Sequence, residues 1–106
     1  MAKYLIKASY TAVGAKGLLK EGGSKRVAEV EKVLEGLGGK LETLYYAFGD
    51  ADVVAIVDLP DQAAVTAFSL TVNATGTVHT STTPLISPQE VDQACKKTVK
   101  FRAPGA

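Results

Sequence analysis

The chain has 106 residues and a formal net charge of +1, from 12 Lys and Arg against 11 Asp and Glu. This length supports one domain with a single core and leaves no room for a second domain. One cysteine and one histidine exclude a disulfide framework and are too few for a metal site built on such ligands, so we expect no metal and no cofactor. The longest unbroken apolar run is Val53 to Val57, so we expect a cytoplasmic protein with no signal segment and no membrane contact.

The first part of the chain predicts a strand followed by a broken helix. Residues 3–10 alternate between apolar and more polar side chains, the two-residue period of a strand with one buried face. Thr11 is a good N-cap, and helical spacing of small and aliphatic residues then extends to Leu37. Gly22-Gly23 interrupts this spacing, and we expect Ser24 to cap the second segment. The result is one broken helix over residues 12–37.

The middle of the chain predicts a hairpin. Residues 40–48 place apolar side chains on both sides of a strand, and residues 49–51 form a tight turn. Residues 52–57 form a strand in which neither face is polar. We therefore predict a central strand that is covered on both faces.

The last part of the chain predicts a helix, a strand and a second, short helix. Pro60 suits a first helical turn, and an Ala-rich helix runs on to Asn73-Ala74. A strand follows over residues 77–83. The run from Ser87 to Glu90 has the pattern of a capping box with proline at the first helical position, and it opens a short helix to about Lys96.

This order is β-α-β-β-α-β plus a terminal helix, which predicts an α+β, ferredoxin-like fold with a four-stranded antiparallel sheet. The domain covers residues 1–96, and residues 97–106 form a basic tail. Both long helices cover one face of the sheet, so the other face exposes apolar side chains. We expect a second copy of the chain to cover that face, in a homodimer or a higher homo-oligomer. The tail is expected to add a strand to a neighbouring subunit.

The chain resembles the GYD-domain proteins, which have ferredoxin-like folds of the dimeric α/β-barrel group. The resemblance extends over most of residues 3–95 and rests on the runs Tyr4 to Thr11, Ser24 to Arg26, Leu37 to Lys40 and Phe48 to Val54, together with Gly14. The motif behind the family's name brings together a glycine, an aromatic residue and an aspartate at the predicted hairpin. Gly49 and Asp52 match it, whereas Ala51 stands at the aromatic position. The resemblance implies the fold and self-association and carries over no activity.

Three residues are candidates for a ligand site. Tyr10 ends the first strand beside the start of the helix, and Arg26 lies early in the second helical segment. His79 is the one side chain whose ordinary pKa lies near neutrality, and it shares a strand face with Thr77, Ser81 and Thr83. Each also has a simple structural interpretation: a core tyrosine, a surface ion pair and an exposed strand residue.

Nucleic acid is not an expected partner. Residues 1–95 carry a net charge of −3, and the predicted central strand has no aromatic side chain on which a base could stack. The sequence leaves three functions open. The first is a homo-oligomeric domain that binds a small organic ligand between sheet and helices, the second is a cofactor-independent monooxygenase or isomerase, and the third is a regulatory or interaction module.

Overall fold

The computed structural model describes residues 1–106. Four strands and four helices follow one another as β1 (Ala2–Tyr10), α1 (Ala12–Glu21), α2 (Gly23–Gly36), β2 (Lys40–Tyr46), β3 (Val53–Leu59), α3 (Gln62–Ala74), β4 (Val78–Pro84) and α4 (Pro88–Cys95). The sheet order is β2-β3-β1-β4 and every neighbouring pair is antiparallel. The predicted ferredoxin-like arrangement is confirmed, with β1 and β3 at the centre of the sheet.

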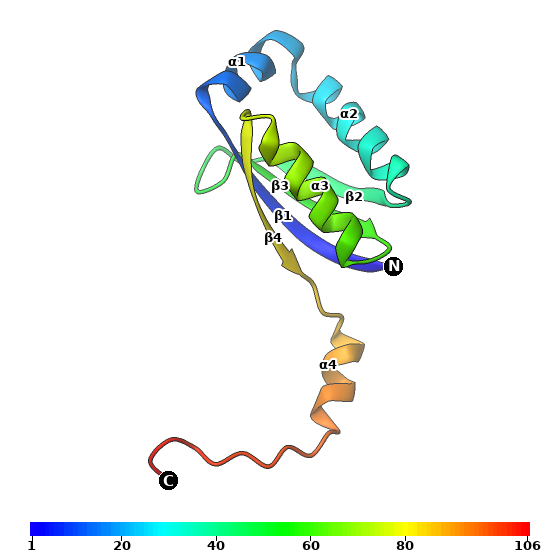
Figure 1. Cartoon of the computed structure of the whole chain (residues 1–106), viewed down its shortest axis with the longest axis vertical. Coiled ribbons are helices and arrows are strands. Elements are labelled where there is room, and N and C mark those ends of the chain that lie inside the picture. The colour runs from blue at the N-terminus through cyan, green and yellow to red at the C-terminus, as the bar shows by residue number, and fades with distance from the viewer.

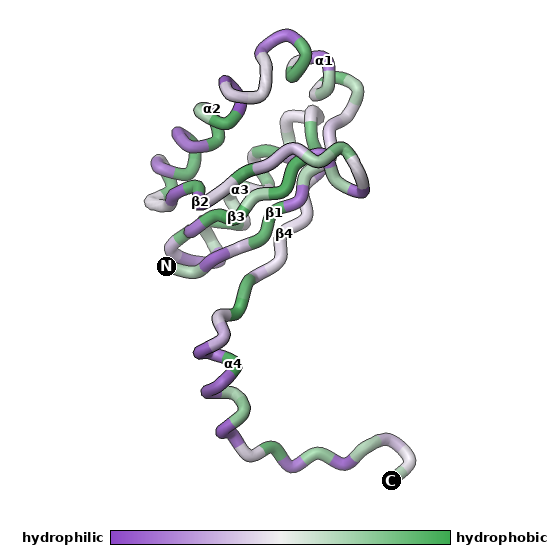
Figure 2. Tube along the Cα trace, turned by 180° about the vertical axis from the view of Figure 1, so that it is seen from behind, coloured by the Kyte–Doolittle hydropathy of each residue, from purple (hydrophilic) through white to green (hydrophobic).

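The helices α2 and α3 cover one face of the sheet. Figure 1 shows both helices in front of the strands, and in the reverse view of Figure 2 the strands lie in front of α3. We call the face that points away from these helices the outer face. Alternation along β1 and β3 divides their side chains between the two faces. The outer face has no helix of this chain over it.

The core lies between the sheet and the two helices. Its central cluster combines inward side chains of β1 and β3 with one residue of α2 and two of α3: Tyr4, Ile6, Ala55, Val57, Leu59, Leu34, Val65 and Phe68. Leu34 and Leu59 are fully buried. Burial of aliphatic and aromatic side chains of this size contributes roughly 1.5–3 kcal/mol each. This cluster therefore holds α2 and α3 against the sheet.

The predicted break in the first helix is confirmed and lies at Gly22. This residue has φ of 86° and its backbone N–H donates to Leu18 O, which ends α1. A positive φ at this position favours glycine. Two predicted helix starts are wrong: Ser24 is not a cap but lies inside α2, which has Gly22 as its N-cap, and Pro60 is not in the first turn of α3 but precedes the cap residue Asp61.

A bulge in β2 alters the expected division of its side chains. Leu41 pairs with Val57, but the next paired residue, Thr43, lies opposite Ile56. The extra residue shifts the alternation, so Leu41, Leu44 and Tyr46 lie on the helix side. The regular alternation predicted for residues 40–48 is therefore wrong at the bulge: Leu41 lies on the helix side, and Thr43 and Tyr45 occupy the outer side.

The end of the chain leaves the body of the domain. After β4, α4 and the segment that follows it extend away from the sheet (Figure 1), and every residue from Pro88 onward is exposed. The radius of gyration is 17.2 Å, whereas a compact chain of about 100 residues has roughly 13 Å. We call residues 85–106 the arm. No helix in the chain is long and apolar enough to cross a membrane.

Candidate functional site

A cavity of about 290 Å³ lies between the sheet and the helices α2 and α3. Most of its lining is apolar and comes from the inward side of β1, β2 and β3 and from both helices, including Ile6, Leu44, Val57, Val30, Phe68 and Val72. Its polar lining includes Tyr10, Arg26, Glu29, Tyr46, Thr75 and Thr77. We call this space the inner cavity.

Tyr10 reaches the inner cavity because three hydrogen bonds fix the end of β1. The Tyr10 backbone N–H donates to Asp52 Oδ2 at 2.7 Å, and the Asp52 backbone N–H donates to Ala8 O at 2.8 Å. The backbone N–H of Thr11 donates to Thr77 O at 2.9 Å. Asp52 of the hairpin thus has a structural role: it ties the β2–β3 connection to β1 and sets the direction of the tyrosine.

The Tyr10 phenol stays protonated over the physiological range. Burial, together with the neighbouring Tyr46 phenol and against the opposite effect of Arg26, raises its pKa to about 12. At neutral pH the hydroxyl is a hydrogen-bond donor and is not a base.

Tyr46 supplies a second phenol on the same lining. Its hydroxyl donates to Gly23 O at 3.0 Å, which joins β2 to the first turn of α2. A Cβ on Gly23 would lie 3.0 Å from the Tyr46 ring, so glycine at this position leaves room for the tyrosine. The ring of Phe48 stacks on Tyr46 with 6.0 Å between centroids, and Phe48 itself has φ of 55°.

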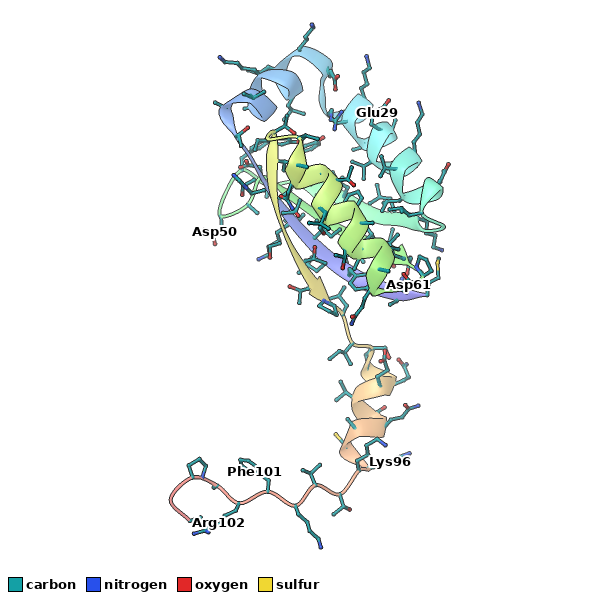
Figure 3. The ribbon with its side chains drawn as sticks, in the orientation of Figure 1. Glu29, Asp50, Asp61, Lys96, Phe101 and Arg102 are labelled. Atoms are coloured by element: carbon teal, nitrogen blue, oxygen red, sulfur yellow. The ribbon has the colours of Figure 1, made fainter.

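Arg26 and Glu29 extend from α2 toward the cavity. Arg26 Nη1 lies 3.4 Å from Glu21 Oε2 in an exposed ion pair, and Glu29 Oε1 lies 3.7 Å from Lys32 Nζ. Exposed pairs of this kind contribute little to stability. This ion pair uses only Nη1 of Arg26. The other N–H groups of the guanidinium are donors that an anionic ligand could engage. Figure 3 shows Glu29 on α2 above the sheet.

His79 does not belong to this cavity. It pairs with Ser9 of β1 and is exposed, and it shares the outer side of β4 with Ser81 and Thr83. The expectation that His79 shares a strand face with Thr77 fails because Thr77 precedes β4 and lines the inner cavity. The structure thus brings Tyr10 and Arg26 together and places His79 on the opposite face of the sheet.

A second, more open groove of about 380 Å³ runs between α3 and the edge strand β4. Its polar groups are largely paired with one another. Asn73 Nδ2 donates to Thr80 Oγ1 at 2.9 Å, the Thr80 backbone N–H donates to Asn73 Oδ1 at 2.9 Å, and the Ser69 and Thr82 hydroxyls lie 3.2 Å apart. These bonds join α3 to β4 and leave few free polar groups for a ligand.

The inner cavity combines an apolar interior with a small set of polar groups. Its lining includes two phenols, one guanidinium and one carboxylate, and contains no imidazole and no thiol. The chain has no group of three or more His, Cys, Asp or Glu side chains placed to hold a metal ion. The arrangement can bind an apolar molecule and donate hydrogen bonds to an acceptor or anionic group on it.

Sequence reasoning did not identify Tyr46 or Glu29 as site residues. Tyr46 faces the cavity only because of the bulge in β2, and nothing in the alternation of residues 40–48 locates that bulge. Ala51, at the aromatic position of the hairpin motif, does not line the inner cavity. The aromatic group close to Tyr46 is instead Phe48.

The family model described as the GYD domain matches residues 4–95. The match covers β1 to α4 and agrees with the resemblance found in the sequence. No curated protein and no solved structure matches the chain.

Proposed function

The chain belongs to the GYD domain family, and we propose that it is a homo-oligomeric module that binds a small organic molecule in the inner cavity. The ligand has an apolar body and one anionic or hydrogen-bond-accepting group. The observation that carries this proposal is the placement of Tyr10 and Arg26 on the lining of an otherwise mainly apolar cavity.

The size of the cavity supports a ligand. Protein interiors are close-packed and contain few voids larger than a water molecule. The inner cavity, at about 290 Å³, is close to the lower end of ligand sites, roughly 300–1,000 Å³. Its volume suits one or two fused rings better than a larger ligand.

The polar groups support an acceptor on the ligand. The pKa of Tyr10, about 12, keeps this phenol protonated, and Arg26 carries a permanent positive charge. A carboxylate, phenolate or enolate oxygen would accept from both. Glu29 disfavours a second negative charge on the ligand, so a monoanion fits better than a dianion.

Self-association is supported by the outer face. Leu5, Val54 and Ile56 lie at its centre and are half-buried, and Tyr45 is exposed beside them. Contiguous apolar side chains without a cover within the chain favour a protein partner. A second copy of the chain is the partner we propose.

Naphthalene-2-carboxylate is a suitable probe because it joins a flat apolar body to one carboxylate. We expect saturable binding by isothermal titration calorimetry, and weaker binding for Arg26→Met. Because the Arg26 side chain is 42% exposed, we discount the full value of a charged hydrogen bond to about 1 kcal/mol, or roughly fivefold in Kd.

Lys25→Met is the matched control, since it removes a neighbouring positive charge that does not line the cavity. Equal losses for Arg26→Met and Lys25→Met would show that only the net charge of α2 matters, and no binding by the wild type would contradict the proposal. Native mass spectrometry of the purified protein would then identify a retained natural ligand.

Binding ranks ahead of catalysis because of the groups on the lining. A cofactor-independent oxygenase or isomerase of this fold would need a base to take a proton from its substrate. Tyr10 is protonated at neutral pH and His79 lies on the other face, so Glu29 is the single candidate base.

A further inference from the structure

The helix α1 contributes little to the core of the domain. None of its residues belongs to either cluster of buried apolar side chains, and Gly14 is its one buried residue. Figure 1 shows α1 beyond the end of the sheet, where it meets α2 at an angle. The two helices are joined at Gly22, whose φ of 86° breaks the helical path. The position of α1 therefore depends on a few local contacts.

Two of these contacts are with the residues that anchor the proposed ligand. Gly14 packs so closely on Tyr10 that a Cβ at this position would lie 2.9 Å from Cδ1 of the tyrosine ring. At the other end of α1, Glu21 Oε2 lies 3.4 Å from Arg26 Nη1 of α2. No residue of α1 lines the inner cavity. The helix thus lies behind both anchors and touches each of them without forming part of the lining.

The ion pair of Glu21 and Arg26 places each charge at the unfavourable end of its helix. Glu21 is the last residue of α1, where the negative end of the helix dipole disfavours a carboxylate. Arg26 lies at the start of α2, where the positive end disfavours a cation, and the first turn of α2 has no acidic residue to offset it. The pair is also exposed, so it contributes little to stability. Local rules broken in this way are typical of functional contacts.

We propose that Glu21 competes with the ligand for the guanidinium of Arg26, and that binding transfers this guanidinium from Glu21 to the anionic group in the inner cavity. This inference rests on the ligand site proposed above and adds its regulation. A neutral ligand has no charge with which to replace a carboxylate, so the contact selects for an anionic ligand. Its free N–H groups allow Arg26 to engage the incoming anion before Nη1 leaves Glu21.

The transfer has a consequence for α1. Once Arg26 has moved to the ligand, Glu21 stays without a counter-ion at the negative end of the α1 dipole. Occupation of the cavity therefore loosens the last turn of α1, next to the break at Gly22. By the reciprocity of linked equilibria, whatever removes Glu21 from Arg26 strengthens ligand binding by the same factor.

Glu29 is not the competing carboxylate. It lies one turn beyond Arg26 on α2 and lines the cavity, but its Oε1 lies 3.7 Å from Lys32 Nζ. Glu21 instead contacts Arg26 from the side of α1, outside the lining. Substitution of Glu21 therefore changes the availability of Arg26 and leaves every group on the lining in place.

Isothermal titration calorimetry of Glu21→Gln with naphthalene-2-carboxylate tests the competition. We expect about threefold tighter binding than in the wild type, the scale of an exposed ion pair with an unfavourable helix dipole on each side. Naphthalene-2-carboxamide has the same shape without the charge, and its Kd should not change. Circular dichroism shows that the variant is folded.

Two variants separate this effect from net charge. Glu31→Gln removes a negative charge from α2 at an exposed residue that does not line the cavity, and it should leave the Kd unchanged. In an Arg26→Met background, Glu21→Gln should no longer tighten binding. If either Glu31→Gln alone or Glu21→Gln in that background tightens binding about threefold, only net charge matters and the proposal is overturned.

Hydrogen exchange measured by NMR tests the loosening of α1. The Gly22 backbone N–H donates to Leu18 O at 2.8 Å and reports on the last turn of this helix. We expect naphthalene-2-carboxylate to speed its exchange about two- to threefold in the wild type and to leave it unchanged in Glu21→Gln. Slower or unchanged exchange in the wild type would contradict the transfer of Arg26.

The outcomes separate this inference from the proposed function. A wild type that binds naphthalene-2-carboxylate while Glu21→Gln binds it equally or more weakly contradicts the competition alone, because ligand binding in the inner cavity then stands. A wild type that does not bind this probe contradicts both.

Discussion

Two adjacent residues of β3 offer a sharp test of how the sheet divides its side chains. Ala55 is 5% exposed, faces the helices and lies between Ile6 of β1 and Leu44 of β2. Val54 is half-buried on the outer face, opposite Lys7 of β1. Ala55→Asp and Val54→Asp introduce the same charge on opposite sides of one strand. We expect the first to unfold the domain and the second to dissociate the oligomer.

The magnitude for Ala55→Asp follows from its burial. A fully buried carboxyl shifts its pKa by about 3–5 units, or roughly 4–7 kcal/mol at 1.36 kcal/mol per unit. The inner cavity admits solvent beside Ala55, so we place the cost near the lower end, at about 4 kcal/mol. A chain of this length has roughly 5–15 kcal/mol of stability in total. The substitution therefore removes a large part of the stability of the fold.

The cost of Val54→Asp in a single chain is smaller. The new carboxylate lies opposite Lys7, and a cross-strand pair of opposite charges contributes roughly 0.2–1 kcal/mol, which offsets part of the lost strand preference. Urea unfolding followed by circular dichroism gives the stability, and sedimentation velocity gives the mass. Ala55→Val and Val54→Thr are the controls of similar shape. If Ala55→Asp leaves the urea midpoint unchanged, or Val54→Asp unfolds the chain, the assignment of the two faces is wrong.

Three further predictions concern single groups. Absorbance at 295 nm should show one tyrosine that ionises near pH 12 and disappears in Tyr10→Phe, because burial raises the pKa of this phenol; a normal titration of all four tyrosines contradicts the burial. Gly14→Ala should lower the melting temperature strongly, because its Cβ would overlap the carbonyl that precedes β4, while Gly17→Ala, with open space around it, should not lower it. Lys3→Met should lower the urea midpoint more than Lys7→Met, because Lys3 Nζ lies 3.0 Å from a buried carboxylate of β3; equal effects would show that this ion pair contributes nothing.

The fold was largely predictable from the sequence because its local signals agree with one another. The alternation in residues 3–10 and the apolar run from Val53 to Val57 correctly identify the two central strands. Gly22-Gly23 locates the break between α1 and α2, and the pattern Ser87 to Glu90 locates the start of α4. Each of these signals acts within a few residues of the chain, so no tertiary information is needed to interpret it.

The site was predictable only in part because it depends on contacts between distant segments. Tyr10 was correctly placed at the end of the first strand beside the start of a helix, and this position brings it to the lining of the inner cavity. The side of β2 that Tyr46 occupies depends on a bulge. Either side of β2, turned toward the helices, would bring apolar residues inward, so the sequence pattern does not choose between them. His79 lies in a strand whose Thr and Ser side chains give no apolar pattern to distinguish the two faces. Ligand binding itself stays a prediction.

The measurement that tests the central claim most directly is a titration of ¹⁵N-labelled protein with naphthalene-2-carboxylate, followed by two-dimensional NMR. We predict saturable shifts of the backbone amides of Tyr10, Arg26, Tyr46 and Val72, which line the inner cavity, and no shift at His79 on the outer face. Shifts confined to the groove between α3 and β4 or to the arm, or shifts that grow linearly without saturation, would contradict a ligand site between sheet and helices.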